Sequence, residues 1–353
     1  MGAGGPRLVT PAPWPRDERE CTRLLALDPA PGSWRDAHLA DLPGLLRPGD
    51  LLVVNDAATL PASLPARTES GEPLELRLAA TEGDEWWAVA FGAGDWRQRT
   101  EDRPAPPPLA AGDGLAVGQA LQARVRAVSS VSPRLLRLRF DADPQALWSA
   151  LYRDGRPVQY SYLQAPLALW HVQTPYHSRP WAMEMPSAGR ALTVHLLEEA
   201  RRRGAAVAWL THAAGLSSTG DPALDAQLPL PERYEVPAQT VAAVRAARAA
   251  GGRVIAVGTT VVRALECAAA GGELRAGAGT AALRLHAGHA RRVVDGLLTG
   301  MHEPGTSHFD LLGAFAPLPL LQRALGHAEE AGYLGHEFGD AMLILDGALS
   351  ATR

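Results

Sequence analysis

The sequence predicts a mixed α/β protein with a second, smaller unit built of short strands. One observation is an apolar segment, residues 254–257, which has glycines on both sides and is followed by a helical pattern from residue 261. Short apolar runs are typical of buried strands, and a strand followed by a helix is the repeating unit of α/β sheets. The other observation is a series of short segments between residues 64 and 140 that alternate apolar and polar residues. Such alternation, with frequent turns, predicts a small β-barrel or β-sandwich.

The turn between the predicted strand and helix consists of Gly258, Thr259 and Thr260. The first backbone N–H groups of a helix have no partner within the helix, so they can hold an anion or a sugar hydroxyl. Arg263 and Glu266 are three residues apart and therefore share one face of this helix. An ordinary strand–helix unit without a ligand has the same spacing, and on spacing alone we favour that interpretation.

A second pair of polar residues, Asn55 and Asp56, follows the predicted buried strand at residues 51–54. In open α/β sheets, ligands bind beyond the carboxyl ends of the strands, where these two side chains are expected. Asn and Asp also bond to their own backbone in tight turns. A purely local turn therefore stays open as the alternative.

Composition limits the classes of protein to which the chain can belong. Its 353 residues are 46% hydrophobic and 20% charged, which is enough for one large or two medium globular domains. The formal net charge is −4, and all 34 basic residues are arginine. Lysine Schiff-base chemistry and a P-loop lysine are therefore excluded. Several arginines lie on the alternating segments 74–78, 120–128 and 136–140, where we expect a solvated face.

We expect a cytoplasmic protein without a metal. Cys21 and Cys267 are too few for a disulfide framework or a thiolate metal site, and such usage is typical of a reducing compartment. His286 and His289 lie close together in sequence without a third ligand. No apolar run approaches the length of a membrane span, and residues 1–6 lack the features of a secretory signal.

Residues 256–266 (AVGTTVVRALE) resemble the A-V-G-T-T-x-x-R-x-L-E segment of the S-adenosylmethionine:tRNA ribosyltransferase-isomerase family of queuosine biosynthesis. Residues 16–27, 41–56 and 338–345 are similar to further segments of that family, in the same order. The resemblance implies a larger mixed α/β domain with an inserted small β-barrel domain. On this basis we expect the α/β domain at residues 1–62 and 150–353, and the barrel domain at residues 63–149.

The resemblance also implies an activity. The family transfers the ribosyl group of S-adenosylmethionine to an amine, such as 7-aminomethyl-7-deazaguanine in tRNA, rearranges it, and releases adenine and methionine. This chemistry requires a base for the proton beside the sulfonium, a group that assists adenine departure, and clamps on the ribose. It implies S-adenosylmethionine as substrate, tRNA as a possible partner and no metal. The titratable groups at family motif positions, expected to be catalytic, are His212, Glu232, His302 and Asp340.

Of these four groups, we expect His302 or His212 to move the proton. We expect the substrate to be bound by motif residues in several segments. They are Asn55, Asp56, Pro186, Ser187, Ala188, Gly189, Gly258, Thr259, Thr260, Arg263, Thr299 and Thr306.

The sequence departs from the family motifs at several positions. Ala191 and Gly300 replace a motif histidine and a motif asparagine, and both histidines that precede the motif glutamate, here Glu232, are missing. The lost groups fall in loops at strand ends, where ligands are recognised. Two further hypotheses therefore stay open: a relative that uses a small-molecule acceptor, and a non-catalytic paralogue that binds a nucleoside or RNA. Net charge gives tRNA binding no support, and the sequence leaves monomer and homodimer equally open.

Overall fold

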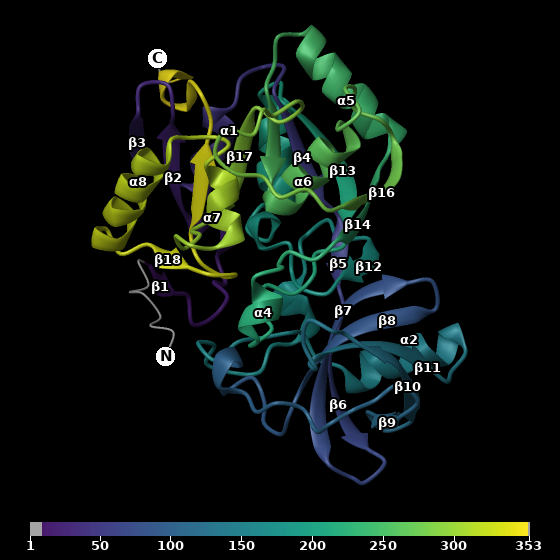
Figure 1. The fold of residues 1–353 in the computed structure, drawn as a ribbon. Coiled ribbons are helices and arrows are strands. Elements are labelled where there is room, and N and C mark those ends of the chain that lie inside the picture. Colours follow the sequence, from purple (N-terminus) through teal and green to yellow (C-terminus); the bar gives the residue numbers. More distant parts are fainter. Residues whose placement is uncertain (1–8, 352–353) are drawn as a thin grey trace.

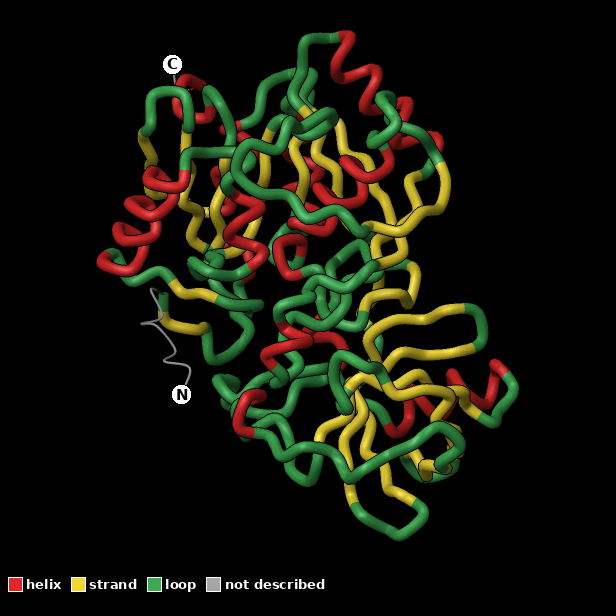
Figure 2. The backbone as a smooth tube through the Cα atoms, in the orientation of Figure 1, coloured by secondary structure: helices red, strands yellow, loops and turns green. Residues whose placement is uncertain are grey.

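The computed structural model describes residues 9–351, so the N-terminal segment 1–6 lies outside the described residues. Figure 1 shows a large sheet with its helices in the upper part of the molecule and a smaller group of strands in the lower part. Figure 2 shows that long loops join the two groups of strands. The predicted class, mixed α/β with an inserted β-barrel, is confirmed. The domain boundaries at residues 62/63 and 149/150 stay a prediction.

Within residues 9–351, the large sheet has nine strands in the order β16-β14-β13-β4-β15-β17-β19-β2-β3. Their bounds are β2 Arg23–Asp28, β3 Ser33–His38, β4 Leu51–Asn55, β13 Ala206–His212, β14 Glu232–Val236, β15 Val254–Val257, β16 Gly277–Ala281, β17 Gly296–Gly300 and β19 Ala341–Ile344. Strands β13, β4, β15 and β17 run parallel, whereas β14 and β19 run antiparallel to their neighbours β13 and β17. The C-terminal ends of the four parallel strands and the N-terminal ends of β14 and β19 therefore meet at one edge of the sheet.

Helices cover both faces of this sheet. On one face lie α5 to α8, and on the other lie α1 and α3. The bounds are α1 Leu42–Leu45, α3 Val194–Arg202, α5 Ala238–Ala249, α6 Thr259–Ala268, α7 Ser307–Leu312 and α8 Leu318–Glu330. The central part of strand β2 is continuously apolar because both of its faces are buried. Leu25 and Leu27 pack into the core beneath α5 to α8, and Leu24 and Ala26 pack into the core beneath α1 and α3. A strand buried on both faces has no polar side to alternate with.

The lower group of strands is a closed barrel in the order β10-β11-β8-β7-β6-β9. The bounds are β6 Ser63–Thr68, β7 Pro73–Glu82, β8 Glu85–Phe91, β9 Gly114–Val117, β10 Leu121–Val128 and β11 Leu135–Phe140. The barrel has its own hydrophobic core, which contains Phe91 and the alternate apolar residues of each strand. Helix α2 (Pro144–Asp154) follows the barrel in the chain and packs against this core.

Short elements lie between the barrel and the sheet. Strand β5 (Ala57–Thr59) pairs in parallel with β12 (Arg179–Ala182), and β1 (Thr10–Pro11) pairs in parallel with β18 (Leu334–Gly335). Helix α4 (Pro222–Asp225) packs against the barrel core through Leu224. None of the helices in the described residues is long and apolar enough to cross a membrane.

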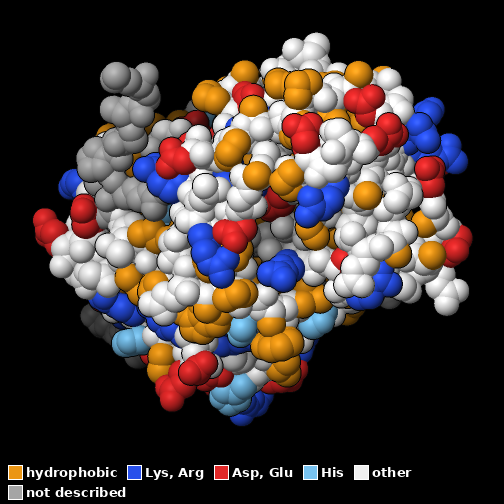
Figure 3. Space-filling model, turned by 90° about the horizontal axis from the view of Figure 1, so that it is seen from below, with side chains coloured by type: hydrophobic (Ala, Val, Ile, Leu, Met, Phe, Trp, Pro, Cys, Tyr) orange, Lys and Arg blue, Asp and Glu red, His pale blue; other side chains and the backbone are white. Residues whose placement is uncertain are grey.

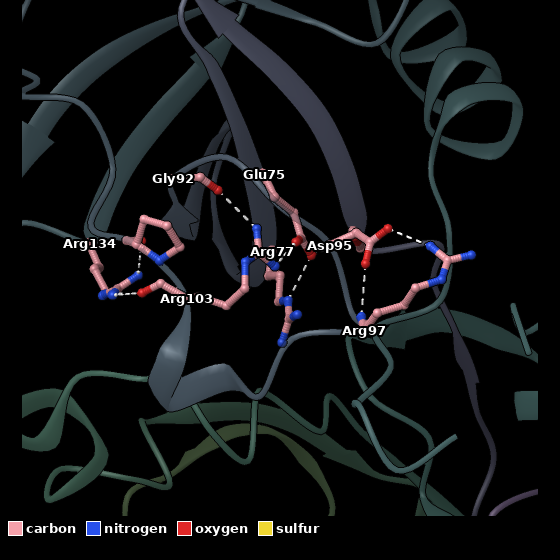
Figure 4. Close-up of polar contacts among 9 residues, drawn as sticks. Glu75, Arg77, Gly92, Asp95, Arg97, Arg103 and Arg134 are labelled. Carbon is pink, nitrogen blue, oxygen red and sulfur yellow. Dashed lines mark hydrogen bonds and ion pairs between the residues drawn. The ribbon is translucent and has the colours of Figure 1, made fainter. Parts of the chain in front are cut away.

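The expected solvated face of barrel arginines is wrong for Arg77, whose side chain is only 1% exposed. Its Nε donates to Glu75 Oε1 at 2.8 Å, and Arg103 Nη1 donates to the other oxygen of the same carboxylate at 2.5 Å. Figure 4 shows both guanidinium groups converging on Glu75, whereas the Asp95–Arg97 pair lies to one side. The guanidinium carbons of Arg77 and Arg103 also lie 4.6 and 5.2 Å from the centre of the Phe91 ring. Sequence alternation missed this cluster because strand periodicity does not distinguish a buried ion pair from a solvated one.

Candidate active site

The predicted site residues gather at the sheet edge where the parallel strands end. Asn55 ends β4, His212 ends β13, Gly258 follows β15, and Thr299 lies next to the end of β17. Glu232 begins β14, whose antiparallel direction brings its first residue to the same edge. This convergence follows from strand direction alone, and it places residues far apart in sequence around one region.

Asn55 links two strands and the helix of the central strand–helix unit. Its side-chain Nδ2 donates to the carbonyl oxygen of His212 at 3.0 Å, and its Oδ1 accepts from the N–H of His212 at 2.9 Å. Oδ1 also accepts from the N–H of Ala57 at 3.1 Å, which is the local turn considered as the alternative. Thr260 Oγ1 lies 3.5 Å from Nδ2. Asn55 therefore fixes the position of His212 relative to the start of α6.

His212 is fully buried, and its two ring nitrogens have no hydrogen-bond partner within the described residues. Its Nε2 lies 3.5 Å from Glu232 Oε2, which is too long for a strong hydrogen bond. Burial, and to a smaller extent the positive charge of Arg263, lowers the pKa of His212 to about 3. The imidazole is therefore neutral at pH 7 and has one nitrogen available as a base.

Glu232 and Arg263 form a buried ion pair beside this imidazole. Arg263 Nη1 contacts Glu232 Oε2, and its Nη2 donates to the carbonyl oxygen of Ala281 at 2.7 Å. The N–H of Gly215 donates to the other oxygen of Glu232. Burial raises the pKa of Glu232, and the charge of Arg263 opposes that rise. Since Arg263 is only 5% exposed and its donors face protein atoms, the structure gives it the role of positioning Glu232.

His302 forms a second imidazole site with a residue that the sequence analysis missed. Its Nε2 lies 2.7 Å from Thr299 Oγ1, and its ring stacks on His308 with centroids 5.1 Å apart and planes at 13°. Burial, followed by the neighbouring His308 and His336, lowers the pKa of His302 to about 3. Burial, followed by Arg263, lowers the pKa of His308 to about 4. Both rings are therefore neutral at pH 7, with a nitrogen lone pair available, although the lowered pKa makes each a weaker base than a free imidazole.

The turn before α6 lies against the short 3₁₀ helix formed by Ser187–Gly189. Gly258 has φ +92°, a left-handed conformation that side chains rarely adopt, and a Cβ there would lie 3.6 Å from Ala188 Cβ. The glycine is thus required by the backbone conformation. The approach of Ala188 brings Pro186, Ser187 and Gly189 beside Thr259 and Thr260, two segments that the sequence analysis assigned to substrate binding.

Three other predicted residues already have protein partners. Asp340 is 2% exposed and accepts from the N–H groups of Arg23 and Leu334, while Arg16 Nη1 lies 2.6 Å from its carboxylate. Asp56 accepts from the hydroxyls of Thr211 and Ser178 at 2.6 and 2.8 Å. Thr306 caps α7 by accepting from the N–H of Phe309 at 3.2 Å. These contacts have evident structural roles, and a ligand role for the three residues stays a prediction.

Comparison with known proteins identifies the family. Residues 9–344 match the family model described as "Queuosine biosynthesis protein". The chain belongs to this family. A relative from Acidithiobacillus ferrooxidans, named S-adenosylmethionine:tRNA ribosyltransferase-isomerase, is 38% identical over 349 residues, covering 96% of this chain and 94% of the relative. A relative of the same name from Thermus thermophilus is 35% identical over 340 residues, covering 93% of this chain and 94% of the relative.

A solved structure supports the same assignment. The crystal structure of S-adenosylmethionine tRNA ribosyltransferase from Thermotoga maritima matches 95% of this chain and 96% of its own length, with a TM-score of 0.53 and 25% sequence identity. This queuosine biosynthesis family member therefore shares its fold with that protein.

In this family member, sequence analysis missed His308 and also three polar residues of a cavity near the candidate site. Tyr160, Glu184 and Glu337 lie between the barrel and the sheet, and they contribute to one cavity. No motif or spacing marks them, because they come from loops distant in sequence. Only Glu184, two residues before Pro186, lies near a segment that the sequence analysis had selected. Within residues 9–351, no group of three His, Cys, Asp or Glu residues is placed to hold a metal ion.

Proposed function

We propose that this protein is an S-adenosylmethionine:tRNA ribosyltransferase-isomerase. In this reaction it transfers and rearranges the ribosyl group of S-adenosylmethionine onto the amine of 7-aminomethyl-7-deazaguanine in tRNA, with release of adenine and methionine. The observation that carries the proposal is the convergence of residues from several family motifs, among them the imidazoles of His212 and His302, at one edge of the sheet. The relatives' shared name over more than nine-tenths of the chain supports the same substrates.

The residues at this edge suit the two proton transfers of the reaction. A neutral imidazole can remove the proton from the carbon beside the sulfonium, and Thr299 at 2.7 Å from His302 Nε2 orients the ring. Glu232 lies beside His212 and is held by Arg263 and by the N–H of Gly215, so a carboxyl group is fixed at the same edge for the second proton transfer. The hydroxyls of Thr259 and Thr260 at the start of α6 can hold the ribose hydroxyls or the carboxylate of the methionine portion.

One face of the molecule supports the tRNA part of the proposal. Figure 3 shows hydrophobic, arginine and histidine side chains lying close together in the lower half of that view, with acidic side chains among them. Trp170 is 72% exposed, and its ring centre lies 5.5 Å from that of His171. An exposed aromatic ring such as that of Trp170 is suited to stack on an unpaired base. A cytoplasmic location agrees with a tRNA substrate and is part of the same proposal.

The test is adenine release from S-adenosylmethionine by purified protein, measured by chromatography. One sample contains tRNA carrying 7-aminomethyl-7-deazaguanine, another contains unmodified tRNA, and a third contains no tRNA. We expect adenine only in the first sample, with a matching mass increase of the modified nucleoside. Adenine release without tRNA would instead indicate a small-molecule acceptor or none. Binding of S-adenosylmethionine without turnover in any sample would contradict the enzymatic proposal.

The residue roles are tested with two variants. His302→Asn removes the stacked base, and His212→Asn removes the buried imidazole beside Glu232. Because general-base catalysis contributes about 10²- to 10⁴-fold in rate, we expect a loss of kcat in that range from the variant whose imidazole takes the proton. If both variants keep wild-type kcat, neither imidazole is the base.

A further inference from the structure

A small cavity lies between the barrel and the sheet, beside the candidate active site. Its volume is about 20 Å³, enough for one water molecule or one ammonium group. The wall is largely apolar, and its polar side chains come from loops that are distant in sequence. The lining polar residues are Thr59, Gln159, Tyr160, Glu184 and Glu337.

Most of these polar side chains already have partners. Thr59 donates to the carbonyl of Val172, and Gln159 accepts from the N–H of Leu167 and donates to Ala165. Glu184 receives the hydroxyl of Tyr160. Glu337 differs: its Oε2 is buried and has no hydrogen-bond partner within the described residues. A buried carboxylate oxygen without a partner is costly, so a donor that arrives with a ligand is the expected complement.

Charge indicates which kind of donor fits. Two carboxyl groups, Glu184 and Glu337, share one apolar cavity, and burial raises the pKa of both, that of Glu337 to about 7. The nearest cation on the barrel side is Arg77, whose guanidinium carbon lies 5.6 Å from the centre of the Tyr160 ring. Its Nε donates to Glu75, as Figure 4 shows, and its charge opposes the rise that burial causes in the pKa of Glu184. Arg77 therefore offsets the charge of Glu184, whereas Glu337 has no ion-pair partner within the described residues.

The cavity also lies between the two imidazole sites. On one side, the N–H of Glu184 contacts the carbonyl of Ala214 at 3.3 Å, and the next residue, Gly215, donates to Glu232. On the other side, Glu337 follows His336, whose Nε2 lies 3.5 Å from an oxygen of Glu303, the residue after His302. A group held in the cavity would thus approach the region where the proposed reaction takes place.

We propose that this cavity is an ammonium-binding subsite, in which the carboxylate of Glu337 pairs with the primary ammonium group of a substrate. The inference rests on the proposed function, because two compounds of that reaction carry such a group. One is the acceptor with its aminomethyl side chain, and the other is S-adenosylmethionine with its α-ammonium. If the acceptor occupies the subsite, a proton moves from its nitrogen to Glu337 Oε2, leaving a neutral carboxylic acid and an amine whose lone pair is free to attack.

The test uses Glu337→Gln, which keeps the shape of the side chain and removes its charge. Calorimetric titration measures the dissociation constants of S-adenosylmethionine and, separately, of free 7-aminomethyl-7-deazaguanine. Because hydrogen bonds to charged groups are among the stronger ones in proteins, we expect about 10- to 100-fold weaker binding of one of the two ligands. Weaker binding of the deazaguanine alone assigns the subsite to the acceptor, and weaker binding of S-adenosylmethionine alone assigns it to the methionine portion.

A matched control and a second variant keep the result interpretable. Glu198→Gln removes an exposed carboxylate of α3 that pairs with Arg201, and it should leave both dissociation constants unchanged. Glu337→Asp retains a carboxylate and should recover part of the lost affinity, which a merely structural role of Glu337 does not predict. Circular dichroism melting confirms that each variant is folded.

The subsite proposal would be overturned if Glu337→Gln bound both ligands as tightly as the wild-type protein does. It would also be overturned if the wild-type protein bound neither ligand. The two proposals fail separately. Absence of adenine release together with binding that depends on Glu337 contradicts the reaction and leaves the subsite standing. Adenine release together with unchanged binding contradicts only the subsite.

Discussion

Replacing Arg263 by methionine tests the electrostatics of the buried ion pair. Arg263→Met keeps much of the length of the side chain but removes the only cation that contacts Glu232 within the described residues. The carboxylate is 7% exposed and stays in the same apolar surroundings. Its pKa, already raised by burial, should rise further, because the charge of Arg263 is the largest influence that opposes that rise.

The size of the effect has an upper limit. The limit arises because the buried carboxyl group of Glu232 can take up a proton instead of staying charged. The free-energy cost then cannot exceed that of protonating the same group in the unfolded chain, where its pKa has the ordinary value of 4.5. At about 1.36 kcal/mol per pH unit, the charge-dependent loss is at most about 3.4 kcal/mol at pH 7 and about 1.4 kcal/mol at pH 5.5. The sign follows from proton binding: a folded-state pKa above the unfolded value means that stability falls as pH rises between the two.

The assay is urea unfolding of wild type, Arg263→Met and the double variant Arg263→Met/Glu232→Gln at pH 5.5 and 7.0. We expect the loss of unfolding free energy in Arg263→Met to be larger at pH 7.0 by up to about 2 kcal/mol. His212, whose lowered pKa also depends on Arg263, shifts in the same direction. The double variant lacks the carboxyl and should lose most of this dependence. An equal loss at both pH values would refute the reasoning.

Three further predictions concern stability and activity. Glu75→Gln leaves the buried guanidinium groups of Arg77 and Arg103 with only a neutral partner, so it should lower the unfolding free energy by about 3–5 kcal/mol in denaturant titrations. As a control, Asp95→Asn removes the charge from the exposed Asp95–Arg97 pair and should lower it by less than about 1 kcal/mol. Thr299→Val removes the hydroxyl bonded to His302 and should lower kcat about tenfold with little change in melting temperature; a change in melting temperature without a change in kcat would contradict an orienting role. Glu266→Gln removes the charge of a carboxylate that accepts from the N–H groups of residues 292–294, and it replaces one accepting oxygen by an amide nitrogen that cannot accept. Amide hydrogen exchange at residues 292–294 should therefore become faster, and unchanged exchange would show that other contacts hold the loop.

The fold and the convergence of the site could be predicted from the sequence because they depend on periodicity and strand direction. The strand at residues 254–257 and the turn at Gly258 were recognisable, and the ends of parallel strands must meet at one edge. The alternating segment at residues 136–140 was also recognisable, and it forms most of β11.

What could not be predicted depends on which loops touch. His308, which stacks on His302, lies just beyond the motif residue Thr306 and matches no motif position itself, and Glu337 and Glu184 line one cavity although their loops are distant in sequence. The burial of Arg77 escaped prediction for a related reason. Arg103, which donates to the same carboxylate of Glu75, lies in a loop 26 residues further along the chain than Arg77, and the strand pattern does not determine the path of that loop.

Helix α6 makes three structurally important sets of contacts within ten residues. Its first turn borders the sheet edge where the predicted site residues lie. Arg263 forms an ion pair with Glu232, and the carboxylate of Glu266 accepts hydrogen bonds from the N–H groups of residues 292–294. Inserting or deleting one residue inside α6 would rotate everything beyond it by about 100° and break these attachments together. Related sequences should therefore keep the length of α6 fixed and vary instead in the glycine- and alanine-rich segment that precedes the anchored residues. The fixed rotational positions of residues on α6 thus limit where insertions and deletions can occur in this region.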